Sequence, residues 1–247
     1  MQSRRVLVTG SSRGIGRAIA LKLAEDGWSV AVHYGFDKPE AERVQKALGD
    51  RCSGIYECDL AHPRKVGDFF DAVLKDGQVD AVVNNAGVYL PIDFAKAGDA
   101  PFAANFHKTF AVNFESPVAL MRVAVKHFQT IGGGKVLNVA SRVGFRGESG
   151  AALYAASKAA LINMTRSLAV ELAPKNIQMF AVAPGWVDTA MAREGMQDRL
   201  SSILEGIPLG RMATPDDVAA CAKFLLSKEA EYLSGIAIDI NGASYFH

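Results

Sequence analysis

The chain has few of the residues that build disulfide frameworks, metal centres and membrane spans. Its three cysteines, Cys52, Cys58 and Cys221, are odd in number and form no CxxC pair, which argues against a disulfide framework and a zinc site. The five histidines are scattered without HExxH-like spacing, so they are interpreted as core or solvated side chains. No apolar run reaches the length of about 18 residues that a transmembrane helix needs, and no membrane span is expected.

An excess of charge of one sign is also missing. The 247 residues carry a formal net charge of +1, which gives no reason to expect nucleic acid or an anionic membrane as the main partner. Hydrophobic residues make up 49% and charged residues 21%, a balance typical of a globular protein. The N-terminal residues lack the apolar core and cleavage site of a secretory signal. These features predict a soluble, cytoplasmic protein.

Apolar segments of strand length alternate with longer amphipathic segments along the chain. Such alternation is typical of βαβ units, in which helices cover both faces of a parallel sheet. The pattern predicts the α/β class, with a single doubly wound Rossmann domain over residues 1–247 and a seven-stranded parallel sheet. The predicted strands are 6–9, 29–34, 54–58, 79–84, 134–140, 178–183 and 236–240. The predicted helices are 15–26, 39–48, 63–75, 101–112, 116–130, 152–173 and 215–227.

One long irregular segment is predicted near the C-terminal end of the chain. It covers residues 184–214 and follows the sixth predicted strand. Loops at the carboxyl ends of strands hold ligands in open α/β sheets, so this segment is a predicted lid over the site. No internal repeat or low-complexity linker divides the chain, and the glycine run at 132–134 is interpreted as a helix stop.

A glycine-rich segment, Thr9-Gly10-Ser11-Ser12-Arg13-Gly14-Ile15-Gly16, follows the first predicted strand and begins the first predicted helix. Glycines here let the backbone turn tightly and approach a pyrophosphate, which the free N–H groups of the helix N-terminus then bind. Glycine motifs also occur in ordinary turns, but the place of this one in the first βαβ unit favours a dinucleotide site. The predicted cofactor contacts are Gly10, Ser12, Arg13, Gly14, Ile15 and Gly16.

Two features favour NADP(H) as the cofactor. Arg13 puts a cation in the first helical turn, against the macrodipole, and a bound anion would offset that cost; the alternative is a solvated surface arginine. The second predicted strand ends at His33-Tyr34-Gly35, without the acid that usually binds the ribose in NAD sites. Tyr34 is itself a predicted cofactor contact. Asp37 or a backbone contact could reverse the preference, so NAD(H) stays open as the second cofactor.

Polar and small residues follow the third and fourth predicted strands. The carboxylate of Asp59 could accept a hydrogen bond from an adenine amino group. In Asn84-Asn85-Ala86-Gly87, small residues let a ribose lie close, and an asparagine can tie neighbouring loops together. Each segment alone could be a turn, but their spacing with the glycine motif favours cofactor contacts. The predicted contacts are Asp59, Leu60, Asn85, Ala86 and Gly87.

Tyr154 and Lys158 lie four residues apart in a predicted helix, so both side chains project from one face. An ammonium near a phenol favours the phenolate, which predicts that Lys158 lowers the pKa of Tyr154 from about 10 toward the working pH. Such a tyrosine can donate a proton to an alkoxide or accept one from an alcohol. Ser141 supplies a second hydroxyl that could hold the substrate oxygen. The three residues together predict chemistry on a carbonyl or an alcohol.

Taken in chain order, these motifs resemble those of the short-chain dehydrogenase/reductase family. The resemblance covers essentially the whole chain, and its combination of motifs is specific although each motif alone is not. The length and the ending Ser-Gly-Ile-Ala-Ile-Asp-Ile-Asn-Gly at 234–242 look like the branch that contains 3-oxoacyl-(acyl-carrier-protein) reductases. The matching positions are the glycine motif, Asn84 to Gly87, Asn113, Ser141, Tyr154, Lys158, Pro184 and Gly185.

The resemblance implies a role for each catalytic residue. Tyr154 would act as general acid in reduction and general base in oxidation, while Lys158 would lower its pKa and bind the nicotinamide ribose. Ser141 would orient and polarise the substrate carbonyl. Asn113 would hold a water that connects Lys158 to solvent, although alone it could be a helix breaker or a cap. The implied nicotinamide neighbours are Pro184, Gly185, Val187 and Thr189.

The leading hypothesis is an NADP(H)-dependent reductase that converts a ketone to a secondary alcohol, with a 3-oxoacyl thioester on acyl carrier protein or CoA as substrate. The first alternative is an alcohol, sugar or steroid dehydrogenase that uses the same catalytic group. A remoter alternative is a dinucleotide-sensing regulator without chemistry, against which the presence of both Tyr154 and Lys158 argues. The alanine-rich segment 152–173 and segment 116–130 could form helix–helix interfaces, and the resemblance implies a homotetramer; otherwise the alanines only supply helix propensity.

The sequence says less about the substrate. Residues that flank the catalytic and lid segments are predicted to line the mouth of the site: Arg142, Phe145, Glu148, Trp186 and Met191. Arg142 is a bulky charge at a position where many relatives have a small or apolar residue. An acidic carrier would need a basic rim, and the candidates are Arg122, Lys126 and Lys135, unless they form a solvated face. Ala243 replaces the second glycine of the family's usual Gly-Gly pair.

Overall fold

All strands of the described residues belong to one parallel sheet. The computed structural model describes residues 4–193 and 199–247. The strand order β3-β2-β1-β4-β5-β6-β7, with every pairing parallel, confirms the predicted fold class. The strands are β1 (Arg5–Val8), β2 (Ser29–Tyr34), β3 (Cys52–Glu57), β4 (Ala81–Asn84), β5 (Gly134–Val139), β6 (Ile177–Pro184) and β7 (Ala237–Ile240).

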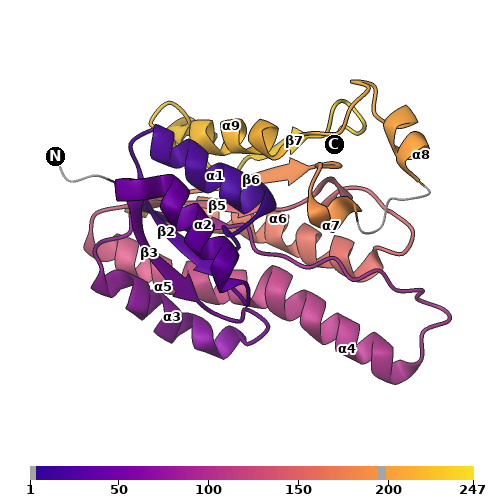
Figure 1. The fold of residues 1–247 in the computed structure, drawn as a ribbon, viewed down its shortest axis with the longest axis horizontal. Helices are drawn as coiled ribbons and strands as arrows, with labels where there is room; N and C mark the ends of the chain where they lie inside the picture. The colour runs from indigo at the N-terminus through magenta and orange to yellow at the C-terminus, as the bar shows by residue number, and fades with distance from the viewer. Residues whose placement is uncertain (1–3, 194–198) are drawn as a thin grey trace.

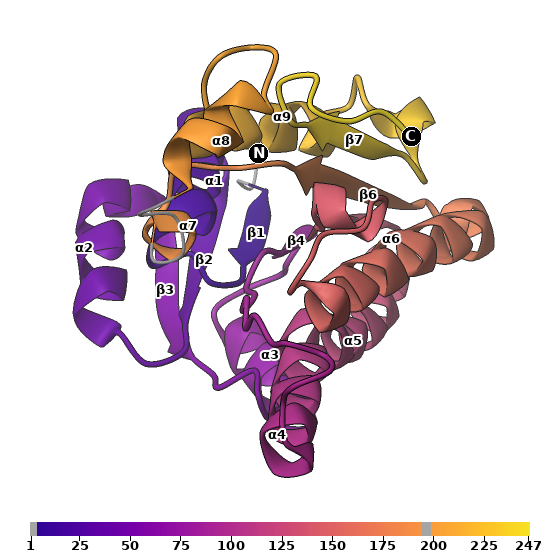
Figure 2. The same cartoon turned by 90° about the vertical axis from the view of Figure 1, so that its right-hand side faces the viewer.

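Helices cover both faces of the sheet (Figures 1 and 2). One layer consists of α1 (Gly14–Glu25), α2 (Lys38–Leu48) and α9 (Pro215–Leu226), the other of α3 (Val66–Lys75), α5 (Ser116–Thr130) and α6 (Ala152–Leu172). The helix α4 (Asp99–Phe110) continues into α5 through a π-helical turn at Ala111–Glu115 and extends beyond the sheet in Figure 1. Within the described ranges, no helix is both long enough and apolar enough to cross a bilayer.

Each strand contributes to two hydrophobic cores. Val6 and Val8 are fully buried on the side of α1 and α9, while Leu7 between them is buried on the side of α3 and α5. Successive side chains of a strand point to opposite faces, so a strand covered on both sides is apolar at every position. This is why the central strands β1 and β4 contain uninterrupted apolar runs, Val-Leu-Val and Ala-Val-Val.

The largest difference from the predicted elements lies in the segment 184–214. The sequence predicts an irregular lid there, but the described part contains two short helices, α7 (Ala190–Arg193) and α8 (Leu200–Glu205). Helices of four and six residues are too short to produce a recognisable amphipathic period. Residues 194–198 of the predicted lid lie outside the described residues.

The two ends of this segment are joined next to the sheet. The N–H of Ala213 donates to the carbonyl of Trp186 at 2.9 Å, and the N–H of Asp188 donates to the carbonyl of Ala213 at 2.8 Å. These bonds form a parallel bridge between Val187 and Ala213. The segment that follows β6 is therefore held by hydrogen bonds to the segment that precedes α9.

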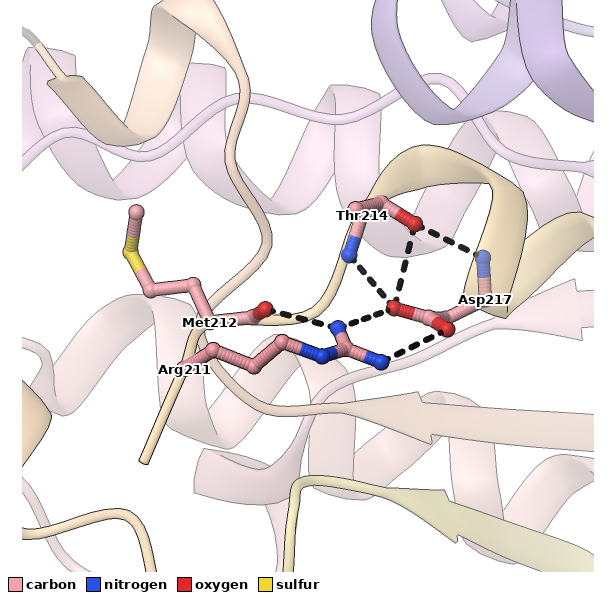
Figure 3. A network of polar contacts seen from close by, with 4 residues as sticks. All are labelled: Arg211, Met212, Thr214 and Asp217. Atoms are coloured by element: carbon pink, nitrogen blue, oxygen red, sulfur yellow. Dashed lines mark hydrogen bonds and ion pairs between the residues drawn. The ribbon is translucent and has the colours of Figure 1, made fainter. Parts of the chain in front are cut away.

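A polar network holds the returning chain at the start of α9 (Figure 3). Thr214 and Asp217 form a capping box, in which each side chain accepts a hydrogen bond from the backbone N–H of the other. Arg211 donates to both carboxylate oxygens of Asp217, at 2.6 and 3.2 Å. The Arg211 guanidinium and the capping bonds hold the pKa of the Asp217 carboxyl well below its usual range.

Candidate active site

The predicted site residues gather at the carboxyl end of the sheet. The strand order reverses between β1 and β4, which are neighbours in the sheet although two strands separate them in the chain. In open α/β sheets, such a switch point leaves a crevice outside the carboxyl ends of the strands, and ligands bind there. The glycine loop follows β1, and the segment from Asn85 to Gly87 follows β4, so the two lie on either side of this point.

The glycine loop passes very close to the loop after β4. Gly10 and Gly14 have φ values of +61° and +56°, which a residue with a side chain adopts only with strain. A Cβ on Gly16 would lie 2.3 Å from the carbonyl oxygen of Gly10 and 2.4 Å from Nδ2 of Asn85. Glycine at these positions is therefore required by backbone conformation and by packing.

Hydrogen bonds lock the two loops together. Oγ1 of Thr9 accepts from the N–H groups of Asn85 at 2.9 Å and Ala86 at 3.1 Å. The side-chain amide of Asn85 donates back to the carbonyl of Thr9 at 2.8 Å and to that of Gly10 at 3.1 Å. Asn85, a predicted cofactor contact, thus also fixes the relative position of the two loops. Together, the loops 9–16 and 85–87 form the predicted cofactor cradle.

His33 is a structural part of this cradle that the sequence leaves among the unassigned histidines. It is 2% exposed, and its Nδ1 accepts the N–H of Gly10 at 2.8 Å. Because Nδ1 is an acceptor, Nε2 carries the proton and donates to the carbonyl of Cys58 at 3.0 Å. Burial lowers the pKa of His33 to about 4, which keeps the ring neutral. His33 therefore connects the glycine loop to the end of β3; only its place at the strand end hints at this in the sequence.

Arg13, Asp37 and Tyr34 surround the end of β2. Arg13 immediately precedes α1, and its exposed side chain forms no capping hydrogen bond. Asp37 caps α2, because Oδ1 accepts the N–H of Glu40 at 3.2 Å. Tyr34 is 5% exposed, packs in the core and donates its hydroxyl to Glu57, so only its backbone remains for a cofactor contact.

The predicted contacts after β3 lie within a turn. Oδ1 of Asp59 accepts the N–H of Ala61 at 2.9 Å, and Oδ2 lies 3.4 Å from Nε2 of His62. Leu60 is buried, and its carbonyl accepts the hydroxyl of Ser116 at 2.7 Å. The Asp59 carboxylate is half-buried and keeps free acceptor positions, so a further donor could still bind it.

Ser141, Tyr154 and Lys158 come together from two elements. Ser141 follows β5 and precedes the short turn Arg142–Gly144, whereas Tyr154 and Lys158 lie in α6. A side-chain hydrogen bond joins Ser141 and Tyr154. A Cβ on Gly144 would lie 3.1 Å from the backbone N of Ala159, so this glycine allows the turn to lie against α6. The structure therefore brings all three residues to one place.

The electrostatics of this group differ from the sequence-based prediction. Burial raises the pKa of Tyr154 to about 12, and the hydrogen bond with Ser141 opposes that shift. The ammonium of Lys158 donates to the carbonyl of Val139 at 2.8 Å and lies 5.6 Å from the centre of the Tyr154 ring. The net shift of the Tyr154 pKa is therefore upward, opposite to the predicted direction, because burial outweighs any effect of the Lys158 ammonium. Burial also lowers the pKa of Lys158 to about 8.

Asn113 ties the catalytic helix to the loop after β4. It lies in the π-helical turn, and such turns are frequent at functional sites. Its Oδ1 accepts the N–H of Val88 at 2.8 Å, and its Nδ2 donates to the carbonyl of Val88 and to Oγ of Ser157. A Cβ on Gly87 would lie 3.3 Å from Oδ1 of Asn113 and 3.5 Å from Nζ of Lys158. Glycine at this position therefore allows the loop after β4 to lie close to both side chains.

The predicted nicotinamide neighbours follow β6 and reach back to the glycine loop. Pro184 ends β6, and a Cβ on Gly185 would lie 2.9 Å from that of Asn241. Val187 is buried within the bridge to the returning chain. The methyl group of Thr189 would lie 3.6 Å from a Cβ on Gly14, which brings the start of the lid segment against the start of α1.

A small cavity lies beside the catalytic group. Its volume is about 190 Å³, and three of the predicted mouth residues line it: Arg142, Glu148 and Trp186. The other two predicted mouth residues do not: Phe145 stacks on the ring of His247 at 3.7 Å, and Met191 is exposed on α7. Arg146 and Arg199 also line the cavity, and neither is a sequence-predicted mouth residue. Arg199 is far from Arg142 in the chain, whereas Arg146 follows it by four residues and could have been found from that spacing.

The candidate basic rim does not form as one patch. Lys135 lies at the amino end of β5, away from the catalytic residues, and donates to the carbonyl of Ser227. Arg122 and Lys126 line a hollow on α5 instead. The sequence-based grouping of these three residues is therefore wrong, because β5 and α5 carry them to different places.

Comparisons with known proteins identify the family. A family model described as enoyl-(acyl carrier protein) reductase matches residues 10–242. The 3-oxoacyl-(acyl-carrier-protein) reductase FabG of Aquifex aeolicus is 34% identical to the chain, over 99% of it and 98% of the relative. FabG of Vibrio cholerae is 32% identical, also over 99% of this chain and 98% of the relative. The chain belongs to the short-chain dehydrogenase/reductase family.

A solved structure agrees with this family assignment. The crystal structure of 3-ketoacyl-(acyl-carrier-protein) reductase from Brucella melitensis complexed with NADH matches with a TM-score of 0.90 and 30% sequence identity, over 98% of both chains. The resemblance inferred from the motifs is thereby confirmed. As a member of the family, this short-chain dehydrogenase/reductase is an NAD(P)-dependent oxidoreductase that acts on a carbonyl or alcohol group.

Proposed function

We propose that the protein is an NADP(H)-dependent reductase that converts the ketone of a 3-oxoacyl thioester to a secondary alcohol. The observation that carries the proposal is the meeting of Ser141 and Tyr154 with Lys158 at the carboxyl end of the sheet, next to the glycine loop. The family model is described as an enoyl reductase, but the relatives are 3-oxoacyl reductases. Two hydrogen-bonded hydroxyls favour the ketone, because both can hold a single carbonyl oxygen.

The cradle fits a dinucleotide. Gly10 and Gly16 let the glycine loop pack closely against the loop after β4, and the N-terminus of α1 presents its first N–H groups to a pyrophosphate. Gly87 lets the loop after β4 lie close to Lys158 and Asn113. A bound nicotinamide would supply the hydride that is added to the carbonyl carbon.

The protein's own residues handle the proton and the orientation. Tyr154 is neutral at pH 7, since burial raises its pKa to about 12, so its Oη can donate a proton to the carbonyl oxygen during reduction. Ser141 would hold the same oxygen. Lys158, charged below its pKa of about 8, would bind the nicotinamide ribose hydroxyls and favour proton loss from Tyr154. The Oδ1 of Asn113 uses one of its acceptor positions for Val88 and keeps the other for a water.

NADP(H) is favoured over NAD(H) by the groups around the end of β2. The Asp37 carboxylate is engaged as the cap of α2, and the exposed guanidinium of Arg13 is free of a capping bond. An exposed guanidinium suits a 2′-phosphate better than a 2′-hydroxyl. NAD(H) remains the second cofactor, in line with the NADH named for the Brucella melitensis structure.

We further infer a carrier and an assembly for the protein. The acyl chain would be carried on acyl carrier protein or CoA, as the names of the relatives suggest. Copies of the chain would meet through α5 and the π-helical turn before it, where Phe114, Val118 and Val123 line a hollow of about 510 Å³ on the surface. Apolar side chains around a surface hollow favour protein contacts, and a homotetramer in the cytoplasm is the proposed state.

A substrate panel tests the activity. Acetoacetyl-CoA, crotonyl-CoA, a set of sugars and a set of secondary alcohols are each assayed with NADPH or NADP⁺ and with NADH or NAD⁺. We expect NADPH oxidation with acetoacetyl-CoA and a far slower reaction with crotonyl-CoA. Preferred turnover of crotonyl-CoA would support enoyl reduction instead, and preferred turnover of sugars or alcohols would support the alternative dehydrogenase.

The variant Tyr154→Phe tests the proton donor. It removes the Oη but keeps the ring, so we expect turnover to fall by about 10²- to 10⁴-fold while the NADPH dissociation constant stays within about twofold. Stopped-flow absorbance measures the first and NADPH fluorescence the second. Unchanged turnover would refute the assigned role, and loss of both turnover and cofactor binding would point to a sensing role for this residue.

A further inference from the structure

The cavity beside Ser141 is rich in positive charge. Among the described residues, three arginines line it, Arg142, Arg146 and Arg199, together with one carboxylate, that of Glu148. Arg142 directly follows Ser141, and Glu148 is close enough to Tyr154 to raise its pKa. The cavity therefore belongs to the substrate side of the proposed reaction.

Arg142 is a buried cation without adequate pairing. Its side chain is 6% exposed; Nη1 donates to the hydroxyl of Ser244 at 2.7 Å, and Nη2 reaches Oε2 of Glu148 only at 3.4 Å. Its Nε is buried and has no hydrogen-bond partner among the described residues. Burial lowers the pKa of Arg142, the charge of Arg146 lowers it further, and Glu148 opposes both. Removing a guanidinium from water carries a large free-energy cost unless ion pairs and hydrogen bonds offset it.

The neighbouring charges do not supply the missing pairing. Within the described part of the chain, Arg142 pairs with the carboxylate of Glu148, and the nearby charge of Arg146 opposes the charge of Arg142. Arg146 is half-buried and Arg199 is exposed at the rim. An anionic group in the cavity would lie among arginine residues that line it, and the planar fork of a guanidinium suits a carboxylate.

We propose that this cavity binds a carboxylate of the substrate, so that the preferred ketone carries an anionic group a few atoms from its carbonyl. The inference rests on the proposed ketone reduction and specifies its substrate class. The carboxylate could end the acyl chain of a thioester or belong to a free 3-oxo acid. A cavity of about 190 Å³ is smaller than the roughly 300–1,000 Å³ of most ligand pockets, so it accommodates a short charged chain better than a long alkyl chain.

The test compares three ketones with the full-length protein. Acetoacetyl-CoA ends in a methyl group, 3-oxoadipyl-CoA ends in a carboxylate, and acetoacetate is a free 3-oxo acid. We expect kcat/KM with NADPH to be at least about tenfold higher for one of the two carboxylate-bearing ketones than for acetoacetyl-CoA. Which of the two is preferred distinguishes the acyl chain from the free acid.

The matched variants are Arg146→Gln and Arg199→Gln, with Arg64→Gln as control. Arg146 and Arg199 are partly or fully exposed, so both variants should fold, whereas Arg64 is exposed on the turn before α3, away from the cavity. Each cavity variant should lower kcat/KM for the preferred carboxylate substrate by about tenfold or more and change the value for acetoacetyl-CoA by less than about twofold. Arg64→Gln should change neither.

The outcomes separate this inference from the proposed function. Reduction of acetoacetyl-CoA without preference for either carboxylate substrate, or equal losses on charged and uncharged ketones in the cavity variants, overturns the carboxylate site while ketone reduction stands. Reduction of none of the three ketones overturns the proposed function, and the carboxylate site with it.

Discussion

The cofactor side and the substrate side of this site are built differently. On the cofactor side, the loops after β1 and β4 are cross-linked by paired groups, with Thr9, Asn85 and His33 each making hydrogen bonds at 3.1 Å or less. On the substrate side, the Nε of the buried Arg142 has no hydrogen-bond partner among the described residues, and its carboxylate partner Glu148 is 3.4 Å away. Within the described ranges, the polar groups named on the cofactor side are paired, whereas the Arg142 guanidinium is paired only in part.

This difference follows from what each side has to bind. A dinucleotide is always the same shape, so a cradle fixed by its own hydrogen bonds binds it without a cost of reorganisation. A substrate pocket gains specificity from polar groups that only the correct ligand satisfies, because any other ligand leaves them unpaired. Changes on the cofactor side should therefore affect stability and all substrates alike, whereas changes in the cavity should depend on the substrate.

The largest effect on the cofactor side is expected from Gly16→Ala. Its Cβ would lie 2.3 Å from the backbone oxygen of Gly10, which cannot move aside as a flexible side chain does. We expect a loss of about 3 kcal/mol in the free energy of unfolding, measured by urea denaturation, together with weaker NADPH binding. The matched control is Gly67→Ala in α3, where a Cβ meets nothing within 4 Å and alanine should be neutral or stabilising by up to about 1 kcal/mol. Equal effects of the two changes would contradict the close packing of the loops.

His33 should make the stability of the cofactor side depend on pH. Its pKa is about 4 in the folded chain against an ordinary value of 6.5, so the unfolded chain binds more protons between these pH values. Stability is then fully present above pH 6.5 and is lost as the pH falls toward 4, by about 2 kcal/mol between pH 7 and pH 5. In His33→Gln this part of the pH dependence should disappear from the denaturation curves. Parallel curves for the native protein and the variant would mean that His33 does not stay neutral when buried.

Arg13→Gln probes the cofactor side without disturbing its internal bonds. If Arg13 binds the 2′-phosphate, the dissociation constant of NADPH should rise by about tenfold or more, since hydrogen bonds to charged groups contribute about 1.5–3 kcal/mol. The dissociation constant of NADH should change by less than about twofold. Arg17→Gln, an exposed position one turn further along α1, is the control and should change neither value. A similar rise in the dissociation constants of both cofactors would show that Arg13 does not bind the 2′-phosphate.

The smallest effect is expected at Ala243, which supports the substrate side through its neighbour Ser244. Ala243 has a φ of +65°, a conformation that glycine adopts without strain. Ala243→Gly should therefore raise the free energy of unfolding by up to about 1 kcal/mol, visible as a higher Tm. The control Ala173→Gly, at a φ of −52°, should lower it by a similar amount. Destabilisation by both changes would mean that the alanine side chain packs favourably in spite of the strain.

Much of the fold and of the cofactor side could be predicted from the sequence. The strand–helix alternation predicts the parallel sheet, and the positions of 29–34 and 116–130 agree with β2 and α5. The glycine motif and the Tyr154–Lys158 spacing are local patterns, whose meaning depends on neighbours within one turn or one βαβ unit. The helices α7 and α8 could not be predicted in this way, because they are too short to carry a period.

Contacts between distant segments could be decided only by the tertiary structure. Folding buries Tyr154, which reverses the predicted direction of its pKa shift, and places Nδ1 of His33 on the backbone of Gly10. It also brings Arg199 to Arg142, although 57 positions separate them in the chain. Local propensity and motif spacing determine which elements form, whereas desolvation and long-range charge depend on which elements meet. The sequence therefore determines that a ketone-reducing group exists, and the packing of the C-terminal segments around Arg142 determines which ketone suits it.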